Sequence, residues 1–275
     1  MVELPTAETT ARDALRQAMT DYYVAYYRDA LGLPDYAHRV NRRLHEDEDF
    51  EHVLGRVRPL IPFFALPSSG RKVLVVGAGT GCEFVYFSQL GYDVYGIEPN
   101  PQARAIIQAK CRLYGFDEGR VLSNGAENLQ FPDTHFDFVW SWTVLEHVSD
   151  YRRSLTEIHR VMKPGAFGYL AMPDMRQFWE AHYKLHLPMF LPKPLLALIL
   201  LALRRPTGFL FNGINRINTR RVRWILEHLG FESLQYFPPW PEAWQRRRTF
   251  GMAVIYWMTW LTGIHRDQYW ILRKP

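Results

Sequence analysis

The chain has 275 residues, of which 48% are hydrophobic, 22% charged and 15% aromatic. This composition is typical of a globular protein and excludes the collagen-like, disordered and disulfide-scaffold classes. A chain of this length can bury a full core, in one large α/β domain with additions or in two domains. The two cysteines, Cys82 and Cys111, cannot form a disulfide framework, and we therefore expect a reducing, cytoplasmic compartment.

The formal net charge is +5, but the charges are unevenly distributed along the chain. Residues 1–174 contain 18 Lys and Arg against 23 Asp and Glu, whereas residues 175–275 contain 15 against 5. An acidic first part is thus followed by a basic second part, and a functional interpretation has to account for this difference.

Neither the N-terminus nor the apolar runs predict a signal peptide or a membrane span. Residues 1–10 contain two acidic side chains and no apolar stretch. The run 195–203 corresponds to about 14 Å of helix, against a hydrocarbon core of about 30 Å. The uncharged run 250–264 is also short for a span. Both runs suit buried core helices or helices that lie in a membrane surface.

Residues 1–70 are predicted to form an N-terminal helical lead. Apolar and aromatic side chains recur at three- and four-residue spacings, which is the helical period. We expect its tyrosines, which are Tyr22, Tyr23, Tyr26 and Tyr27, to pack a helix onto the core. The alternative is that one of them reaches the cofactor or the acceptor.

Residues 71–174 show a different pattern, in which short apolar runs alternate with amphipathic segments. The predicted strands are 72–76, 93–98, 121–123, 136–142 and 166–172, and the predicted helices are 82–90, 101–114 and 151–162. Repeated β-α-β units with short connections indicate a doubly wound parallel sheet.

After Pro173 the alternation is interrupted. Residues 175–217 form a proline-punctuated, apolar and basic insertion that we expect to act as a lid. Residues 218–275 are predicted to close the sheet, with a helix that ends at His228 and strands at 231–236 and 268–272.

The first predicted strand leads into a glycine-rich turn, residues 77–81, that opens a helix. Glycines allow the backbone to approach a ligand, and a helix N-terminus offers unpaired N–H groups. The G-x-G-x-x-G motif of dinucleotide-binding proteins would place its third glycine where Cys82 stands, which counts against a nicotinamide cofactor. Glu98 ends the second strand, where a carboxylate can accept hydrogen bonds from both hydroxyls of a ribose.

Together with the segments 124–127, 135–141, 145–148 and 157–165, these features resemble the class I S-adenosylmethionine-dependent methyltransferases of the type 11 group. The resemblance covers roughly residues 71–174. It implies a Rossmann-like, mostly parallel seven-stranded sheet. It also implies S-adenosylmethionine as the cofactor. The expected fold adds to the sheet the N-terminal helices and a helical insertion after strand five, which the residues themselves predict.

The resemblance also implies where the cofactor binds. The family's positions correspond to Gly77, Ala78, Gly79 and Gly81 around the methionine part, Glu98 on the ribose, Ala126 and Glu127 beside the adenine, and Ser141, Trp142 and Thr143 near the sulfonium. Many relatives carry an acidic residue where Gly125 stands, to hold the adenine amine. Asn124 is our candidate to replace it.

Because a sulfonium is already an activated methyl donor, methyl transfer needs an aligned acceptor and, for a hydroxyl acceptor, a base. Side chains at the carboxyl ends of the strands are the candidates, namely His147, Asp174, Glu180, His182 and Tyr183. His182 is the first choice because it begins the insertion and histidine titrates near neutrality. A packed or capping role is the alternative for His182 and for His147. The spacing of His, Cys and carboxylates predicts no metal site.

The C-terminal part indicates the acceptor class. Residues 204–248 contain nine arginines against three glutamates, next to runs rich in Leu, Trp and Phe. This pattern favours an anionic membrane surface and a small or lipid-linked amphipathic acceptor, such as a glycolipid or an isoprenoid. The equally weighted alternative is that these runs pack as lid core or as a dimer face.

Two other functions remain open from the sequence. Arginines near tryptophans also fit RNA, although Ser141-Trp142-Thr143 stands where base-amine methyltransferases often carry an Asn/Asp-Pro-Pro-Tyr/Phe loop. A nucleic acid partner is therefore not our expectation. A non-catalytic cofactor-binding module is the second alternative, and the intact glycine turn and Glu98 count against it.

Overall fold

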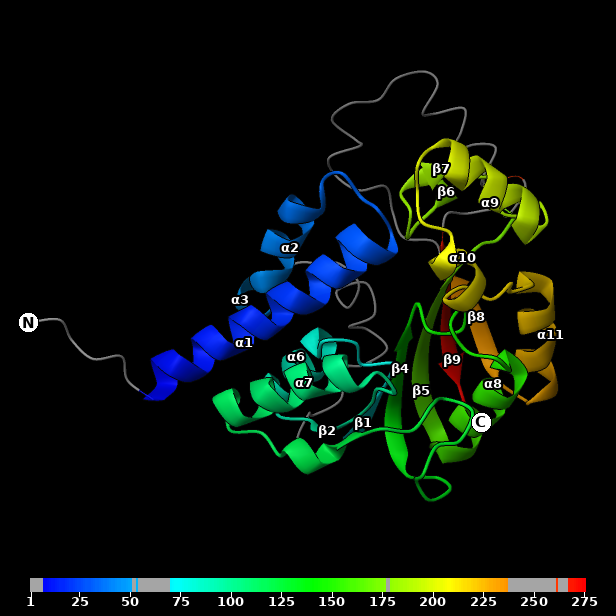
Figure 1. The fold of residues 1–275 in the computed structure, drawn as a ribbon. Helices are drawn as coiled ribbons and strands as arrows, with labels where there is room; N and C mark the ends of the chain where they lie inside the picture. The colour runs from blue at the N-terminus through cyan, green and yellow to red at the C-terminus, as the bar shows by residue number, and fades with distance from the viewer. Residues whose placement is uncertain (1–6, 51–52, 54–69, 177–178, 237–260, 262–266) are drawn as a thin grey trace, which may run out of the picture.

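The computed structural model describes residues 7–50, 53, 70–176, 179–236, 261 and 267–275. The predicted apolar run 250–264 lies outside the described residues except for Leu261. Figure 1 shows a central sheet with helices on both faces and further helices at one end.

The sheet has seven strands in the order β3-β2-β1-β4-β5-β9-β8. All neighbouring pairs are parallel except those made by β9, which runs antiparallel to β5 and to β8. The strands are β1 (Lys72–Val76), β2 (Asp93–Ile97), β3 (Val121–Leu122), β4 (Phe136–Trp142), β5 (Met162–Pro173), β8 (Glu232–Tyr236) and β9 (Asp267–Arg273). The predicted Rossmann-like, mostly parallel seven-stranded sheet is confirmed.

Helices cover the sheet on both faces because its central strands are apolar on both sides. The described helices of the sheet region are α6 (Cys82–Gln89), α7 (Pro101–Tyr114), η3 (Glu118–Arg120), α8 (Tyr151–Val161) and α11 (Thr219–His228). α8 and α11 pack on one face, around Leu74 and Leu170. α6 and α7 pack on the other, around Val75 and Trp140. The parallel strands therefore have no solvent-facing side at the centre of the sheet.

Side-chain caps fix the helix ends that the sequence predicted. The Asn100 side chain accepts hydrogen bonds from the amides of Gln102 and Ala103 at the start of α7. The Asn218 side chain caps α11 in the same way. Gly115 ends α7 with a φ of 74°, a backbone conformation that favours glycine.

The N-terminal helices are α1 (Ala7–Val24), the π-helix η1 (Ala25–Ala30), α2 (Tyr36–Leu44) and α3 (Glu46–Asp49). The segment after β5 contains the strand pair β6 (Trp179–Glu180) and β7 (Leu185–His186), then α9 (Lys193–Ala202) and α10 (Gly208–Asn212). The insertion, expected to be helical, thus begins with a short antiparallel pair of strands.

The N-terminal helices and the insertion share a third hydrophobic cluster. It joins Tyr23 and Tyr27 of the N-terminal helices to Tyr183, Leu196 and Leu200 of the insertion. Segments about 160 residues apart in the sequence thereby pack together. None of the helices in the described part of the chain has both the length and the apolar character needed to cross a bilayer.

Candidate active site

The glycine turn lies between the exit of β1 and the start of α6. Gly77, Gly79 and Gly81 all have φ between 57° and 88°, the left-handed region that favours glycine. A Cβ on Gly77 would lie 2.5 Å from Cγ2 of Val144, so the loop after β4 packs directly on this glycine. A Cβ on Gly79 would meet no described atom within 4 Å. The turn is therefore packed against Val144 at Gly77, whereas the space beside Gly79 is open.

Glu98 follows β2 and lies beside this turn. Its two carboxylate oxygens accept hydrogen bonds from the amides of Gly79 (2.8 Å) and Asn100 (2.9 Å). Burial raises the pKa of Glu98, while the same two amides act in the opposite direction. A carboxylate has about four acceptor positions, so positions remain for two ribose hydroxyls.

The residues after β3 divide into two roles. Oδ1 of Asn124 is buried and has no hydrogen-bond partner among the described residues, whereas its Nδ2 donates to the carbonyl of Asn128 at 2.8 Å. Oε1 of Glu127 accepts from the amide (2.9 Å) and hydroxyl (3.0 Å) of Ser149. Glu127 therefore holds the loop after β4, and Ala126 packs in the core. Of these three, Asn124 has the free acceptor.

The end of β4 contributes the next side chains. Ser141 is buried, and its hydroxyl has no hydrogen-bond partner in the described part of the chain. Trp142 and Thr143 line a cavity that reaches the glycine turn. The Thr143 amide donates to the carbonyl of Ala171 at 2.9 Å, which anchors this exit to β5.

The cavity encloses about 200 Å³. Its walls are Tyr22, Tyr23, Tyr26 and Tyr27 of the N-terminal helices, Arg43, the glycine turn, and Trp140, Trp142 and Thr143. Tyr26 and Tyr27 belong to the π-helix η1, a local widening that is frequent at functional sites. The tyrosines expected to pack a helix onto the core do so, and they also line the cavity.

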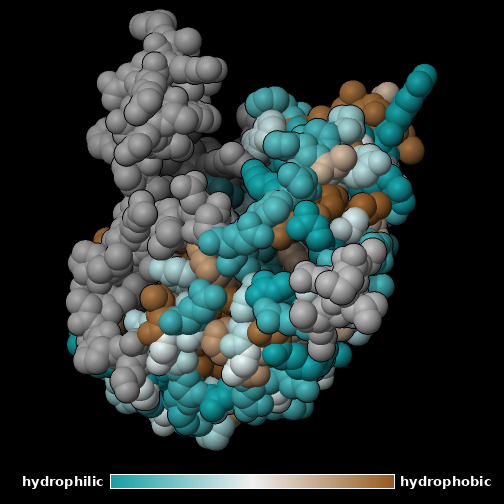
Figure 2. Space-filling model, turned by 90° about the vertical axis from the view of Figure 1, so that its left-hand side faces the viewer, coloured by the Kyte–Doolittle hydropathy of each residue, from teal (hydrophilic) through white to brown (hydrophobic). Residues whose placement is uncertain are grey.

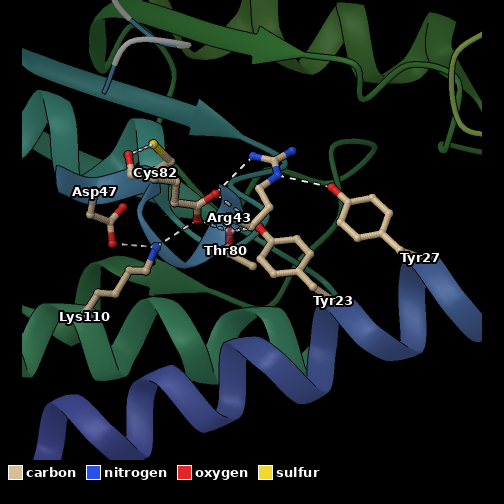
Figure 3. Close-up of polar contacts among 8 residues, drawn as sticks. Tyr23, Tyr27, Arg43, Asp47, Thr80, Cys82 and Lys110 are labelled. Atoms are coloured by element: carbon tan, nitrogen blue, oxygen red, sulfur yellow. Dashed lines mark hydrogen bonds and ion pairs between the residues drawn. The ribbon is translucent and has the colours of Figure 1, made fainter. Parts of the chain in front are cut away.

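A buried ionic cluster fastens the N-terminal helices to the glycine turn (Figure 3). Oε1 of Glu46 accepts from Nζ of Lys110 (3.0 Å) and from the Thr80 hydroxyl (2.6 Å). Its Oε2 accepts from Arg43 at 3.0 Å, and the Tyr23 hydroxyl lies 2.6 Å from that of Thr80. Glu46 thus joins α2 and α3 to α7 and to the turn.

The charges in this cluster stabilise one another. Burial alone would raise the pKa of Glu46, but Lys110 and Arg43 lower it to about 2. Nζ of Lys110 also lies 2.7 Å from Asp47, and its side chain is fully buried. A buried lysine needs such partners, because an unpaired charge in the interior is costly.

This ionic cluster was absent from our sequence predictions. A Glu-Asp-Glu-Asp run such as residues 46–49 is ordinarily a solvated surface segment. The other buried positions of the helix that contains Lys110 are apolar. A lysine on this face was the one sequence signal that could have indicated a buried ion pair. The partners are 64 positions apart, so spacing alone could not pair them.

His182, the first-choice base, lies between β6 and β7, and its Nδ1 is 2.7 Å from Oε1 of Glu180. The other Glu180 oxygen accepts from the amide of Tyr183. Burial would raise the pKa of Glu180, but the hydrogen bond from His182 lowers it. His182 is therefore oriented by a carboxylate, as general bases commonly are.

His147 approaches His182, with 5.2 Å between their ring centroids. Its Nδ1 is hydrogen-bonded to the carbonyl of Gly213, and its Nε2 lies 4.0 Å from Oε1 of Glu146. Burial lowers the pKa of His147 to about 4 and raises that of Glu146 to about 8. The structure thus groups the two predicted catalytic histidines with a buried glutamate.

The other candidate bases have structural partners. Asp174 is buried and accepts from Arg176 (2.7 Å) and from Gln268 (2.6 Å). The Tyr183 hydroxyl accepts from the amide of Leu210 at 3.1 Å, inside the shared hydrophobic cluster. These two side chains hold the insertion and β9 in place.

The residues present fit S-adenosylmethionine. The turn is open where a Cβ of Gly79 would project, Glu98 keeps acceptor positions for a ribose, and the buried Oδ1 of Asn124 is a free acceptor. Beside the turn, tyrosine and tryptophan rings surround a cavity, and aromatic faces attract cations such as a sulfonium.

Comparison with known proteins agrees with this geometry. Residues 74–170 match the family described as "Methyltransferase domain" (Methyltransf_11). The demethylmenaquinone methyltransferase of Tropheryma whipplei is 28% identical over 193 residues, which cover 69% of this chain and 74% of that protein.

Two solved structures share the fold. One is a SAM-dependent methyltransferase from Archaeoglobus fulgidus, with a TM-score of 0.54 and 20% identity, covering 85% of this chain and 99% of that one. The other is phosphoethanolamine N-methyltransferase 2 of Haemonchus contortus in complex with S-adenosyl-L-methionine, with a TM-score of 0.51 and 16% identity, covering 96% of this chain and 60% of that one. The methyltransferase domain at residues 74–170, the similarity to proteins named methyltransferases and the seven-stranded sheet together support a class I S-adenosylmethionine-dependent methyltransferase.

Proposed function

We propose that this enzyme methylates a hydroxyl of a small or lipid-linked amphipathic acceptor. The observation that carries the proposal is the pair His182 and Glu180, in a segment that packs against the cavity-lining helices. An amine acceptor that arrives unprotonated needs no such base, whereas a hydroxyl acceptor must lose its proton.

The proposal assigns the cofactor contacts to the residues that the sequence predicted. Gly77, Ala78, Gly79 and Gly81 hold the methionine part, and Glu98 accepts from the ribose hydroxyls. Asn124 accepts from the adenine amine, with Ala126 and Glu127 supporting that loop. Ser141, Trp142 and Thr143 lie near the sulfonium. S-adenosylmethionine, when bound, would supply an electrophilic methyl group: the bond from the acceptor oxygen to the methyl carbon forms as the bond from sulfur to that carbon breaks, and the sulfur keeps the electron pair.

The two histidines activate the acceptor. Nδ1 of His182 is engaged by Glu180, so Nε2 is the atom that meets the hydroxyl and takes its proton. The Glu180 carboxylate stabilises the imidazolium that results. His147 has a low pKa and stays neutral at physiological pH, so it adds a hydrogen-bonding group without a competing charge.

The acceptor class is supported by the surface of the insertion. One side of α9 is buried through Leu196 and Leu200, but its other side is open to solvent. The exposed apolar side chains are Phe190, Leu195, Leu198, Leu201, Leu203 and Phe211. Arg204 and Arg205 follow directly, so the patch combines apolar contact with positive charge. An anionic membrane surface matches both properties.

Elsewhere the surface is more mixed. Among the residues coloured in Figure 2, hydrophilic ones predominate and hydrophobic ones lie in small groups between them. Some relatives carry the name demethylmenaquinone methyltransferase, which refers to a quinone acceptor. This name also supports an amphipathic acceptor for the present enzyme.

A substrate experiment tests the proposal. Purified enzyme is given S-adenosylmethionine with a short-chain isoprenoid hydroquinone, a glycolipid, or the dimethyl ether of the hydroquinone. Formation of S-adenosylhomocysteine is measured. We expect turnover with a free-hydroxyl acceptor and none with the dimethyl ether.

Variants distinguish the loss of the catalytic base from a loss of folded structure. His182→Ala is expected to lower kcat about 10²–10⁴-fold with unchanged affinity for S-adenosylmethionine. His38→Ala, at an exposed position of α2, is the matched control and keeps full activity. Unchanged turnover in His182→Ala would remove it as the activating residue.

Liposome flotation tests the surface. We expect binding to vesicles with anionic lipid and loss of binding in Leu198→Glu with Leu201→Glu. Leu90→Glu is the control, because Leu90 is an exposed leucine at the end of α6 and outside the patch. Absence of salt-sensitive binding to either kind of vesicle contradicts the membrane part of the proposal.

A further inference from the structure

Three side chains with metal-ligating atoms meet at the boundary between the sheet and the insertion. Glu146 and His147 follow β4, and His182 comes from the turn between β6 and β7. Each offers one possible ligand atom, and these atoms all lie within 4.8 Å of one another. The sequence spacing predicted no metal site, because His182 is 35 positions from His147.

Both histidines already have the partners that metal-binding histidines use. Nδ1 of His182 is 2.7 Å from the Glu180 carboxylate, and Nδ1 of His147 is hydrogen-bonded to the Gly213 carbonyl. A ligating histidine almost always gives its other ring N–H to a carboxylate or a carbonyl, which fixes its tautomer and orientation. In each ring this arrangement leaves Nε2 as the free ligand atom.

Glu146 provides the second, independent observation. Its side chain is 1% exposed, and neither carboxylate oxygen has a hydrogen-bond partner within the described ranges of the chain. The backbone of Glu146 is held in place, because its main-chain carbonyl accepts a hydrogen bond from the amide of Asn215. A buried polar group without a partner costs free energy, and an ion placed between Glu146 and the two rings would remove this cost.

We infer that Glu146, His147 and His182 bind one divalent transition-metal ion of the Zn²⁺ type. Two imidazoles and one carboxylate are a donor set that Zn²⁺ accepts, whereas Mg²⁺ and Ca²⁺ prefer oxygen ligands alone. Bonds of about 2.0–2.2 Å would draw the ligand atoms from within 4.8 Å to about 3.3 Å of one another. Three protein ligands leave a fourth position open, the arrangement of a catalytic site.

The ion has a route to the site. The side chain of His147 is 37% exposed and that of His182 is 12% exposed, so solvent reaches both rings, whereas the Glu146 side chain is 1% exposed. Because its ligands come from both sides of the boundary, the ion also fastens the insertion to the exit of β4.

The catalytic role of this ion rests on the proposed function. A hydroxyl bound at the open position loses its proton more easily, because the ion stabilises the oxyanion. The proton then leaves to solvent, since Nε2 of His182 holds the ion and cannot accept it. Proton transfer to Nε2 of His182, as described above, applies to the enzyme without the ion; with the ion bound, the ion activates the hydroxyl and the two histidines act as its ligands.

The test begins with metal binding alone. The enzyme is stripped with a chelator, the chelator is removed, and Zn²⁺ is titrated by calorimetry. Co²⁺ is added in parallel for its visible absorption, which reports the coordination geometry. We expect one ion per chain, an intense tetrahedral Co²⁺ spectrum, and no comparable binding of Mg²⁺.

Variants assign the ligands. Glu146→Gln and His182→Ala should abolish the stoichiometric binding, and Glu180→Gln should weaken it about 10- to 100-fold. His38→Ala is the control with an intact site, and circular dichroism verifies that each variant is folded. Glu146→Gln keeps the side-chain volume, so it remains informative if an alanine variant does not fold.

The outcomes distinguish the two proposals. If the stripped enzyme binds no Zn²⁺ stoichiometrically, or if the variants bind it like the wild type, the metal site is wrong, although His182-dependent methyl transfer can still be observed. If Zn²⁺ binds and no hydroxyl acceptor is methylated, the metal site stands and the proposed function fails.

Discussion

Nζ of Lys110 lies 3.0 Å from Oε1 of Glu46, and both side chains are almost completely excluded from solvent. This contact joins α7 of the sheet region to the short helix that follows α2. Since Glu46 also accepts from Thr80 in the glycine turn, the N-terminal helices and the cofactor turn are held by the same carboxylate. Stability and cofactor binding are therefore expected to depend on one ionic cluster.

Removing the lysine tests this dependence. Lys110→Ala leaves Glu46 and Asp47 without their shared cation in the interior, and we expect the free energy of unfolding to fall by about 3–5 kcal/mol. Lys163→Ala removes a partly exposed ion pair with Asp137 and should cost at most about 1 kcal/mol. Denaturant unfolding measures both changes, and equal losses in the two variants would contradict the assigned role of Lys110.

Acid should weaken the same cluster. Folding lowers the pKa of Glu46 from 4.5 to about 2, so the folded state favours the ionised carboxylate. Its contribution is fully present above about pH 4.5 and is lost as the pH falls toward about 2.

Glu46→Gln serves as the comparison for this pH dependence. We expect its free energy of unfolding to fall less steeply than that of the wild type between about pH 5 and about pH 3. Urea unfolding at several pH values gives both slopes. Parallel curves for the two proteins would show that Glu46 does not titrate with a lowered pKa.

Two glycines of the turn should respond differently to the same substitution. Both Gly77 and Gly79 have positive φ, so Gly→Ala strains the backbone at either position by about 1–2 kcal/mol. Gly77→Ala also forces a Cβ to 2.5 Å from Val144, whereas Gly79→Ala projects a Cβ into open space. We expect Gly77→Ala to lower stability more, and Gly79→Ala to weaken S-adenosylmethionine binding while the fold is retained.

Thermal unfolding and calorimetry with S-adenosylmethionine separate these effects. The double variant Gly77→Ala with Val144→Ala should recover part of the lost stability, because the clash is removed and only the backbone strain remains. A stability loss in Gly79→Ala that exceeds that in Gly77→Ala would contradict the packing described here.

Asn124 is expected to recognise the adenine amine. Its Oδ1 is a buried acceptor without a partner in the described structure, so Asn124→Ala should lower cofactor affinity by about 1 kcal/mol, or about fivefold. An S-adenosylhomocysteine analogue with inosine in place of adenosine lacks the amine. It should bind the wild type less tightly than S-adenosylhomocysteine, whereas Asn124→Ala should no longer distinguish the two. Undiminished discrimination in the variant would assign the amine to another group.

Much of the fold was determined by local sequence. Lys72–Val76 is a short apolar run ended by a glycine, and Asn100-Pro101 combines a side-chain cap with a proline that suits the first helical turn. Such signals lie within a few residues, so the order of strands and helices, the glycine turn and Glu98 could be predicted. The charge difference between the two parts of the chain could also be counted from the sequence.

The tertiary structure decided which distant residues meet. It placed Lys110 against Glu46, brought His182 to His147, and showed that Glu127 holds a loop while Asn124 keeps a free acceptor. Each of these pairings depends on burial, which leaves a polar side chain with only the partners that packing supplies. A sequence records the chemistry of each group but not its neighbours across the core, so the ionic cluster and the two-histidine site became visible only in the folded chain.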